Sequence, residues 1–126
     1  MTSRTHSILV VDDDSMVLSL YVDALAEAGH RVEVANNGDA ALRRLQTGPV
    51  PCVVLTDVRM PVMDGFELSS ALAADPQLAS IPVVMMTGDR ILSFTSPARD
   101  KPFDPAELDA LVQRSCVLHR RQEGAA

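Results

Sequence analysis

The stretch Ile8-Leu9-Val10-Val11-Asp12-Asp13-Asp14 sets the interpretation of the whole chain, because an apolar run leads directly into three carboxylates. A short continuous apolar run bounded by polar residues is typical of a buried strand in a parallel sheet. The expected strand therefore carries dense negative charge at its carboxyl end, which is costly unless a cation binds there. In open parallel sheets, ligands bind outside the carboxyl ends of the strands.

Two further apolar runs end in residues that carry chemistry. Cys52–Leu55 is followed two residues later by Asp57, and Val83–Met86 ends at Thr87. Lys101 supplies a positive side chain further along the chain. If all these strands are parallel, their carboxyl ends lie at one edge of the sheet, and the polar residues converge. The pattern predicts a site for a hard divalent cation and a phosphoryl group.

Strand and helix patterns alternate along most of the chain, which indicates a doubly wound parallel α/β sheet. We expect a helix capped by Ser15 and ended by Gly29, a strand over 31–34, helices over about 39–46 and 66–74, a strand opened by Ile81 and Pro82, and a last helix with Asp104 as N-cap and Pro105 at its first position.

Length and composition restrict the function classes. The chain has 126 residues and 47% apolar residues, which predicts one domain, placed at 5–120, with no output domain. Its apolar runs are far shorter than the ~20 residues that a membrane span needs. The polar N-terminal residues lack a secretory signal, so a cytoplasmic location is expected. The net charge of −6 argues against direct nucleic-acid binding.

The cysteines and histidines give no motif in the sequence. Cys52 lies in a strand pattern and Cys116 in a helical pattern, and we expect two buried free thiols. His6, His30 and His119 have no spacing that suggests a metal site.

The carboxylates match the requirements of phosphoryl transfer to a protein side chain. A carboxylate can be the nucleophile and form an acyl phosphate. That chemistry needs a metal to offset repulsion between anions, a hydroxyl donor and a cation on the phosphoryl oxygens. Asp57 as nucleophile, Asp12 with Asp13 at the metal, Thr87 and Lys101 fill these roles. The structural alternative for Asp12 to Asp14 is a solvated turn with one capping aspartate.

Several motifs occur together and in order over Ser7 to His119. They are Val10-Val11-Asp12-Asp13, Thr56-Asp57 through Met60-Pro61 and Asp64-Gly65, Val84 to Thr87-Gly88, and Lys101-Pro102-Phe103. In this ordered set the chain resembles the receiver domain of two-component response regulators, of the single-domain type similar to chemotaxis regulators.

The resemblance implies a flavodoxin-like strand order 2-1-3-4-5 and assigns the site residues. Asp57 would be the phosphoacceptor, and Asp12, Asp13 and Asp57 would hold Mg²⁺ together with the main-chain carbonyl of Arg59. The donor would be a phosphohistidine on a sensor histidine kinase or phosphotransfer protein, and a downstream protein would read the phosphorylated state. The chain would be no enzyme beyond catalysing its own phosphorylation and dephosphorylation.

The sequence departs from the family pattern between Thr87 and Lys101. Only residues 88 to 100, thirteen positions, lie between them, and a crossover with its helix normally needs at least ~10 to 12 before any strand. We expect the fourth helix to be missing or reduced to a loop, and the fifth strand to be short or irregular. Ala98 stands where the family has an aromatic switch residue.

Two interpretations of this departure stay open. Either a degenerate loop leaves phosphorylation intact and changes nothing else, or the output face is rebuilt for a different partner or for a homodimer. In the second case, losing the helix would expose apolar side chains of Val83 to Met86 at an interaction surface. Two other functions compete: a non-phosphorylated interaction module of the same fold, and an aspartyl phosphatase using Asp12 and Asp14.

Overall fold

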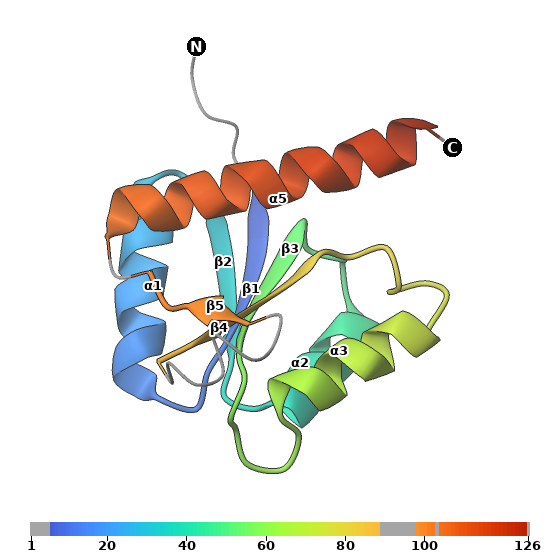
Figure 1. The fold of residues 1–126 in the computed structure, drawn as a ribbon, viewed down its shortest axis with the longest axis horizontal. Helices are drawn as coiled ribbons and strands as arrows, with labels where there is room; N and C mark the ends of the chain where they lie inside the picture. Colours follow the sequence, from blue (N-terminus) through green and yellow to red (C-terminus); the bar gives the residue numbers. More distant parts are fainter. Residues whose placement is uncertain (1–5, 89–97, 103, 126) are drawn as a thin grey trace.

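A parallel sheet forms the centre of the computed structural model, which describes residues 6–88, 98–102 and 104–125, with side chains up to Cys116. Its strands are β1 (Ser7–Val11), β2 (Arg31–Ala35), β3 (Val53–Asp57), β4 (Val83–Thr87) and β5 (Arg99–Asp100). All pairings are parallel, and the strand order is β2-β1-β3-β4-β5 (Figure 1). The predicted doubly wound sheet with order 2-1-3-4-5 is confirmed.

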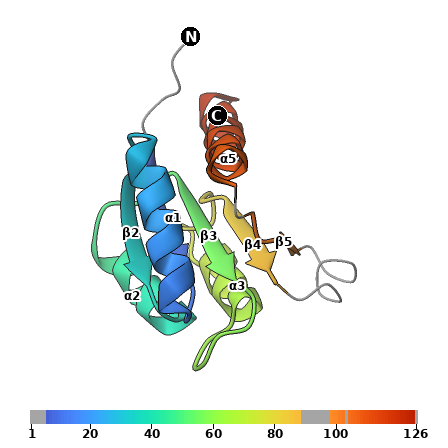
Figure 2. The ribbon, with the colours of Figure 1, turned by 90° about the vertical axis from the view of Figure 1, so that its left-hand side faces the viewer.

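Helices cover both faces of the sheet, as Figure 2 shows. On one face, α1 (Ser15–Glu27) and α5 (Pro105–Ala125) pack against Ile8 and Val10. On the other, α2 (Gly38–Thr47) and α3 (Gly65–Ala74) pack against Leu9 and Val11. Alternate residues of β1 thus enter two separate cores, because successive side chains of a strand point to opposite faces. Both faces of β1 are therefore buried, which explains why Ile8 to Val11 form a continuous apolar run.

The ends of α1 test the expected capping residues. Asp14, rather than Ser15, is the N-cap: its Oδ1 accepts hydrogen bonds from the main-chain N–H groups of Met16 at 2.9 Å and Val17 at 3.4 Å. The expected Ser15 cap is therefore wrong by one residue. A carboxylate is as good a cap as a hydroxyl and adds a favourable charge at the helix N-terminus. At the other end, Gly29 follows the C-cap with φ 93°, a conformation that favours glycine, as predicted.

The region around β4 and β5 corrects one boundary and confirms another expectation. β4 begins at Val83, two residues after the expected opening at Ile81, and the carbonyl of Pro82 accepts the N–H of Val54 at 3.0 Å. Pro82 has no N–H of its own, so it flanks the ladder. β5 is an exposed edge strand of two residues, as short as predicted. The expected loss of the fourth helix concerns residues 89–97, which lie outside the described residues.

The apolar residues of β4 are less exposed than expected. Residues 83–85 are half-buried and Met86 is buried. Together with Arg99 and with Leu111, Arg114 and Ser115 of α5, residues 83–85 line a hollow of about 440 Å³. The prediction of exposed apolar side chains on this strand thus holds in part, because residues 83–85 are half-buried and line a hollow to which Arg99 and Arg114 also contribute.

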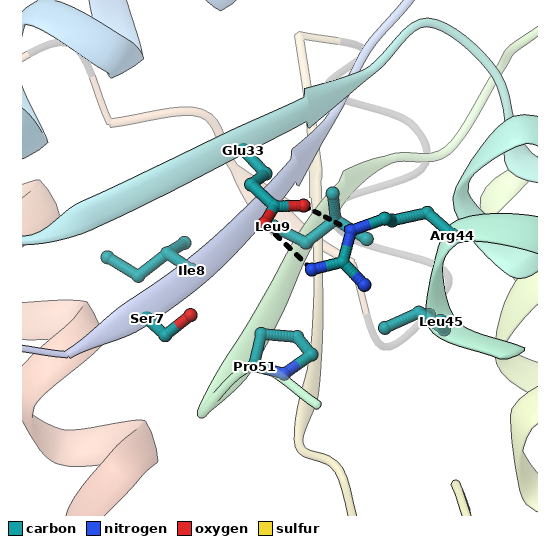
Figure 3. Close-up of a pocket in the computed structure, with 7 residues that line it drawn as sticks. All are labelled: Ser7, Ile8, Leu9, Glu33, Arg44, Leu45 and Pro51. Atoms are coloured by element: carbon teal, nitrogen blue, oxygen red, sulfur yellow. Dashed lines mark hydrogen bonds and ion pairs between the residues drawn. The ribbon is translucent and has the colours of Figure 1, made fainter. Parts of the chain in front are cut away.

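An ion pair fixes α2 against the edge strand β2. Arg44 directs its guanidinium at Glu33, with Nη2 donating to Oε1 at 2.7 Å and Nε donating to Oε2, so both carboxylate oxygens are used (Figure 3). Nη1 also donates to the carbonyl of Pro49 at 3.2 Å. The hydrogen bond from Arg44 lowers the pKa of the Glu33 carboxyl below its ordinary value. The pair thus joins the middle of β2 to the last turn of α2 on the surface of the protein.

Candidate functional site

The carboxyl ends of four strands bring the predicted residues to one edge of the sheet. Asp12 follows β1 directly, Asp57 ends β3, Thr87 ends β4 and Lys101 follows β5. Asp12, Asp57 and Thr87 are buried, and Lys101 is half-buried. The exposed Asp13 joins them, since one carboxylate oxygen from each of Asp12, Asp13 and Asp57 lies within 4.8 Å of the others. The structure therefore assembles the acidic cluster that the sequence predicted.

Lys101 provides the positive charge at this cluster. Its Nζ lies 2.9 Å from Asp12 Oδ2 and 3.5 Å from Asp57 Oδ1, and its side chain is only 11% exposed. Lys101 is the single lysine among 126 residues, although the chain has ten arginines. A compact ammonium on a flexible stem suits a narrow gap between two carboxylates better than a planar guanidinium. The Lys101 main-chain N–H donates to the Thr87 carbonyl at 3.0 Å, which places both residues together.

The charges at the site are not fully balanced. Burial, and next the negative charge of Asp12, raise the pKa of Asp57 above its ordinary value, although Lys101 and the Val58 N–H act in the opposite direction. For Lys101, burial lowers the pKa, but the hydrogen bond to Asp12 and the charges of Asp12 and Asp57 outweigh it and raise the value. The cluster therefore holds more negative charge than Lys101 neutralises, which favours an additional cation.

Main-chain groups hold the two central carboxylates in fixed orientations. Asp57 Oδ1 accepts the Val58 N–H at 2.9 Å, and Asp12 Oδ1 accepts the Asp14 N–H at 3.0 Å. Gly65 approaches the same strand so closely that a Cβ on it would lie 2.4 Å from the Asp57 carbonyl oxygen. The Gly65 N–H donates to the Val58 carbonyl at 2.7 Å, which holds the two segments at this short separation. Only glycine fits here, because any side chain would collide with the Asp57 carbonyl. The motif Asp64-Gly65 thus braces the backbone under the predicted phosphoacceptor.

Comparison with known proteins agrees with this arrangement. The family model of the response regulator receiver domain matches residues 8–113, which contain every residue of the cluster. The chain belongs to this family. The chemotaxis response regulator CheY4 of Vibrio cholerae has a similar structure, with a TM-score of 0.78 and 30% identity, covering 89% of this chain and 99% of that one. The predicted resemblance to receiver domains is confirmed.

Curated relatives of the receiver domain fall into two size groups. An uncharacterized 14.6 kDa protein of Leptolyngbya boryana is 38% identical, covering 92% of this chain and 94% of that protein. The alkaline phosphatase synthesis transcriptional regulatory protein PhoP of Bacillus subtilis is 34% identical over 94% of this chain and 50% of its own length. A response regulator of Synechocystis sp. is 36% identical over 92% of this chain and 53% of its length. The chain thus spans about half the length of several relatives.

The receiver domain contains one polar group near the site that the sequence did not indicate. The Tyr21 hydroxyl of α1 is buried and, within the described part of the chain, has no hydrogen-bond partner. Burial, followed by the charges of Asp12 and Asp57, raises the pKa of this phenol. The helical pattern placed Tyr21 on the core-facing stripe, and it does belong to that core. Nothing in the pattern indicated that its hydroxyl would be buried without a hydrogen-bond partner.

The loop between β3 and α3 carries the remaining predicted ligand. Arg59 lies two residues after Asp57 in this loop and its side chain is exposed. In the same loop Val62 has φ 72° and is 79% exposed. A β-branched residue in the left-handed region is strained. Ala98, at the position of the family's aromatic switch residue, is buried beside β5 and cannot supply a switching ring.

Among the described residues of the receiver domain, no helix is both long and apolar enough to cross a membrane.

Proposed function

We propose that this receiver domain is a phosphorylation-controlled switch of two-component signalling, in which Asp57 accepts a phosphoryl group. The observation that carries the proposal is the position of Lys101 Nζ, 2.9 Å from Asp12 and 3.5 Å from Asp57, inside a cluster of three carboxylates. A purely structural ion pair needs only one of these acids. The surplus negative charge and the family match support a site that takes up a cation and a phosphoryl group.

In the proposed reaction, an Asp57 carboxylate oxygen forms a bond to phosphorus while the bond from phosphorus to the donor nitrogen breaks. The donor is a phosphohistidine, and its imidazole leaves with the electron pair. The hydrogen bond from the Val58 N–H at 2.9 Å fixes the Asp57 carboxylate, so it needs little reorientation for in-line attack. Self-phosphorylation and later hydrolysis of the acyl phosphate are the only catalysis that we propose.

The carboxylates of Asp12, Asp13 and Asp57, with the main-chain carbonyl of Arg59, would hold Mg²⁺. Oxygen ligands of this number and type, completed by water and phosphoryl oxygens, suit that ion. Bound Mg²⁺ offsets repulsion between the carboxylate and the phosphoryl oxygens. The receiver domain of the sensor kinase PA1611, a neighbour with a TM-score of 0.80 and 24% identity, is described with magnesium in its active-site cleft.

Thr87 and Lys101 would contact the transferred group. The Thr87 hydroxyl would donate a hydrogen bond to one phosphoryl oxygen, and the Lys101 ammonium would move from Asp57 toward another. Because the Lys101 N–H is bonded to the Thr87 carbonyl, a displacement of either residue is passed to the strand pair β4 and β5. We propose that this movement replaces the rotation of an aromatic side chain, since Ala98 stands at that position.

The proposed partners are a sensor histidine kinase or phosphotransfer protein and a downstream protein, with a cytoplasmic location. The hollow along β4, β5 and α5 is the candidate output surface, where a downstream protein or a second copy of the chain would dock. Arg99 and Arg114 at this hollow favour acidic side chains on the partner. Size-exclusion chromatography with light scattering, with and without a phosphodonor, distinguishes a dimer from a monomer.

Mass spectrometry after exposure to a small phosphodonor and Mg²⁺ tests the proposal. We expect one phosphoryl group on Asp57, lost in Asp57→Asn because the amide is similar in shape but a poor nucleophile. Asp39→Asn, on the exposed face of α2, is the matched control and should take the label as wild type does. Absence of the modification would support the non-phosphorylated interaction module, and label on Asp12 would support the phosphatase.

A further inference from the structure

Three soft ligand atoms meet at the amino end of the sheet, opposite the acidic cluster. They come from His6 just before β1, Cys52 just before β3, and Cys116 in α5. A ring nitrogen of His6 and the two Sγ atoms all lie within 4.8 Å of one another. His6 and Cys116 are buried, Cys52 is half-buried, and both cysteines are free thiols. Figure 1 shows α5 crossing this end of the sheet, where β1 begins.

The hydrogen bonds around His6 determine which ring nitrogen is available. The Gln113 amide nitrogen donates to Asp109 Oδ1 at 3.4 Å, so its Oε1 is the atom that faces His6 Nε2 at 2.9 Å. An amide oxygen only accepts, and therefore Nε2 carries the proton and Nδ1 carries a lone pair. Within the described part of the chain, this buried Nδ1 has no hydrogen-bond partner. A buried acceptor without a partner costs free energy unless something binds it.

The neighbouring His30 differs from His6 in that both of its ring nitrogens have partners. The two rings stack with centroids 5.6 Å apart. His30 Nδ1 accepts the His6 main-chain N–H at 3.0 Å, and Nε2 contacts Asp109 Oδ1 at 2.6 Å, so both nitrogens are satisfied. The same network thus satisfies both nitrogens of His30 and leaves His6, whose ring lies beside two thiols, with one nitrogen without a partner among the described residues.

Core packing alone accounts for the thiols but not for the imidazole. Cys116 belongs to the core between the sheet and α5, and Cys52 packs against it. Burial, then the charge and hydrogen bond of Cys52, raise the pKa of the Cys116 thiol to about 12, so this thiol is uncharged at neutral pH. A neutral thiol in an apolar core is an ordinary feature. An imidazole lone pair without a partner is not.

We propose that His6 Nδ1, Cys52 Sγ and Cys116 Sγ form a binding site for Zn²⁺. Two thiolates and one imidazole are a donor set that selects thiophilic d¹⁰ cations over Mg²⁺. Zn²⁺ with two thiolates is electrically neutral, so the interior gains no net charge. The half-buried side at Cys52 leaves access for a water as fourth ligand.

The Gln113 side chain acts as the outer partner of this site. It accepts the His6 Nε2–H and thereby orients the ring and keeps the lone pair on Nδ1, as outer partners of metal-binding histidines commonly do. The bound ion would link α5 to the starts of β1 and β3. Metal binding would therefore stabilise the packing of α5 on the sheet.

Titration of the reduced full-length protein with Co²⁺ tests the site, because cobalt bound to thiolates absorbs in the near ultraviolet. Excess Mg²⁺ is present throughout to fill the acidic cluster. We expect an absorption band that saturates at one equivalent and is removed by one equivalent of Zn²⁺. Cys52→Ser and Cys116→Ala should each abolish the band, and Gln113→Leu should weaken Zn²⁺ affinity by about 10-fold or more.

Asp13→Ala is the matched control, because it alters only the acidic cluster, and its band should equal that of the wild type. No band in the wild type, or an unchanged band in Cys52→Ser, would overturn the proposal. Zn²⁺ affinity that falls in Asp13→Ala but not in Cys52→Ser would show that the ion binds only at the acidic cluster. If Cys116→Ala fails to fold, Cys52→Ser still decides, since this half-buried position tolerates a hydroxyl; circular dichroism verifies its fold.

Discussion

The two ends of the sheet solve the problem of buried polar groups in different ways. At the carboxyl end, Lys101 pairs with Asp12 and Asp57, and Asp13 adds a third carboxylate to the cluster, so negative charge is in excess. At the amino end, His6, His30, Asp109 and Gln113 form a network in which nearly every described group has a partner. The carboxyl end thus carries an excess of negative charge, whereas hydrogen bonds between side chains satisfy most polar groups at the amino end.

Backbone conformation follows the same division. The turn at the amino end that joins α1 to β2 has glycine at its left-handed position, Gly29 with φ 93°. The loop at the carboxyl end that joins β3 to α3 has Val62 in a similar conformation, with φ 72°. Strained residues cluster at functional sites, where the surrounding structure holds them in place. The described backbone is therefore relaxed at the amino-end turn and strained in the loop that follows Asp57.

Removing the charge of Lys101 should give the largest effect on stability. In Lys101→Met the stem is kept but Asp12 and Asp57 lose their shared cation, so the free energy of unfolding should fall by about 3 kcal/mol without metal. Urea unfolding measures the change, and added Mg²⁺ should restore part of it. Stability equal to that of the wild type in metal-free buffer would show that the excess charge is already solvated.

Breaking the network at the amino end should have a smaller effect. Asp109→Ala removes the acceptor of the His30 Nε2–H, whose side chain is fully buried, and should cost about 2 kcal/mol. Asp39→Ala breaks the exposed pair with Arg43 on α2 and is the control, with a change within about 0.5 kcal/mol. Urea unfolding measures both changes. Equal losses in the free energy of unfolding would show that the buried network around His30 stabilises the protein no more than an exposed ion pair does.

Relieving the strained loop should stabilise the protein. Val62→Gly places glycine in a left-handed conformation, and because the Val62 side chain is exposed, little packing is lost. The expected gain is about 1 kcal/mol in the free energy of unfolding. Gly29→Ala, which introduces a Cβ at φ 93°, should shift stability in the opposite direction by a similar amount. A loss of stability in Val62→Gly would show that the loop is not strained.

The smallest expected effect is the pH dependence of stability that comes from Asp57. Lys101 and the Val58 N–H offset part of the rise in the pKa of this carboxyl that burial causes. The pKa of Asp57 is raised in the folded state, mainly by burial. The folded state then binds this proton more tightly than the unfolded state, so wild-type stability falls as pH rises through that range. Without metal, Asp57→Asn should exceed the wild type in stability at neutral pH, and the margin should shrink toward pH about 4.

Urea unfolding of both proteins at the two pH values measures this margin. Asp109→Asn, at the amino end, provides the control. It removes a carboxylate that contacts His30 and accepts a hydrogen bond from Gln113. A margin for Asp57→Asn that grows on acidification would contradict the sign derived from burial.

The carboxyl end of the sheet was predictable because sequence position and spatial position coincide there. Each apolar run ends within two residues of the end of its strand. Parallel strands end at the same edge, so Asp12, Asp57 and Thr87 had to approach one another. Lys101 was predicted from its place after the last strand, although β5 consists only of Arg99 and Asp100. The doubly wound parallel sheet followed from the alternation of strand and helix patterns, whereas the strand order was an implication of the resemblance to receiver domains.

The N-cap of α1 and the start of β4 were misplaced by one and two residues. Asp14 and Ser15 are both good capping residues, and sequence gives no means to choose between them. The start of β4 depends on which carbonyl accepts the hydrogen bond from the Val54 N–H, and the acceptor is the carbonyl of Pro82. Such boundaries are decided by hydrogen bonds between strands rather than by the local sequence.

The sequence by itself determined the fold class and the acidic cluster, because both depend on strand periodicity and on the order of the elements. Only the tertiary structure decided that His6, Cys52 and Cys116 meet, because α5 must cross the sheet at one particular angle and height to bring Cys116 there. The same holds for the buried Tyr21 hydroxyl, which has no hydrogen-bond partner among the described residues. Contacts between side chains on a helix and the far end of a sheet depend on packing, which has no signature in residue spacing.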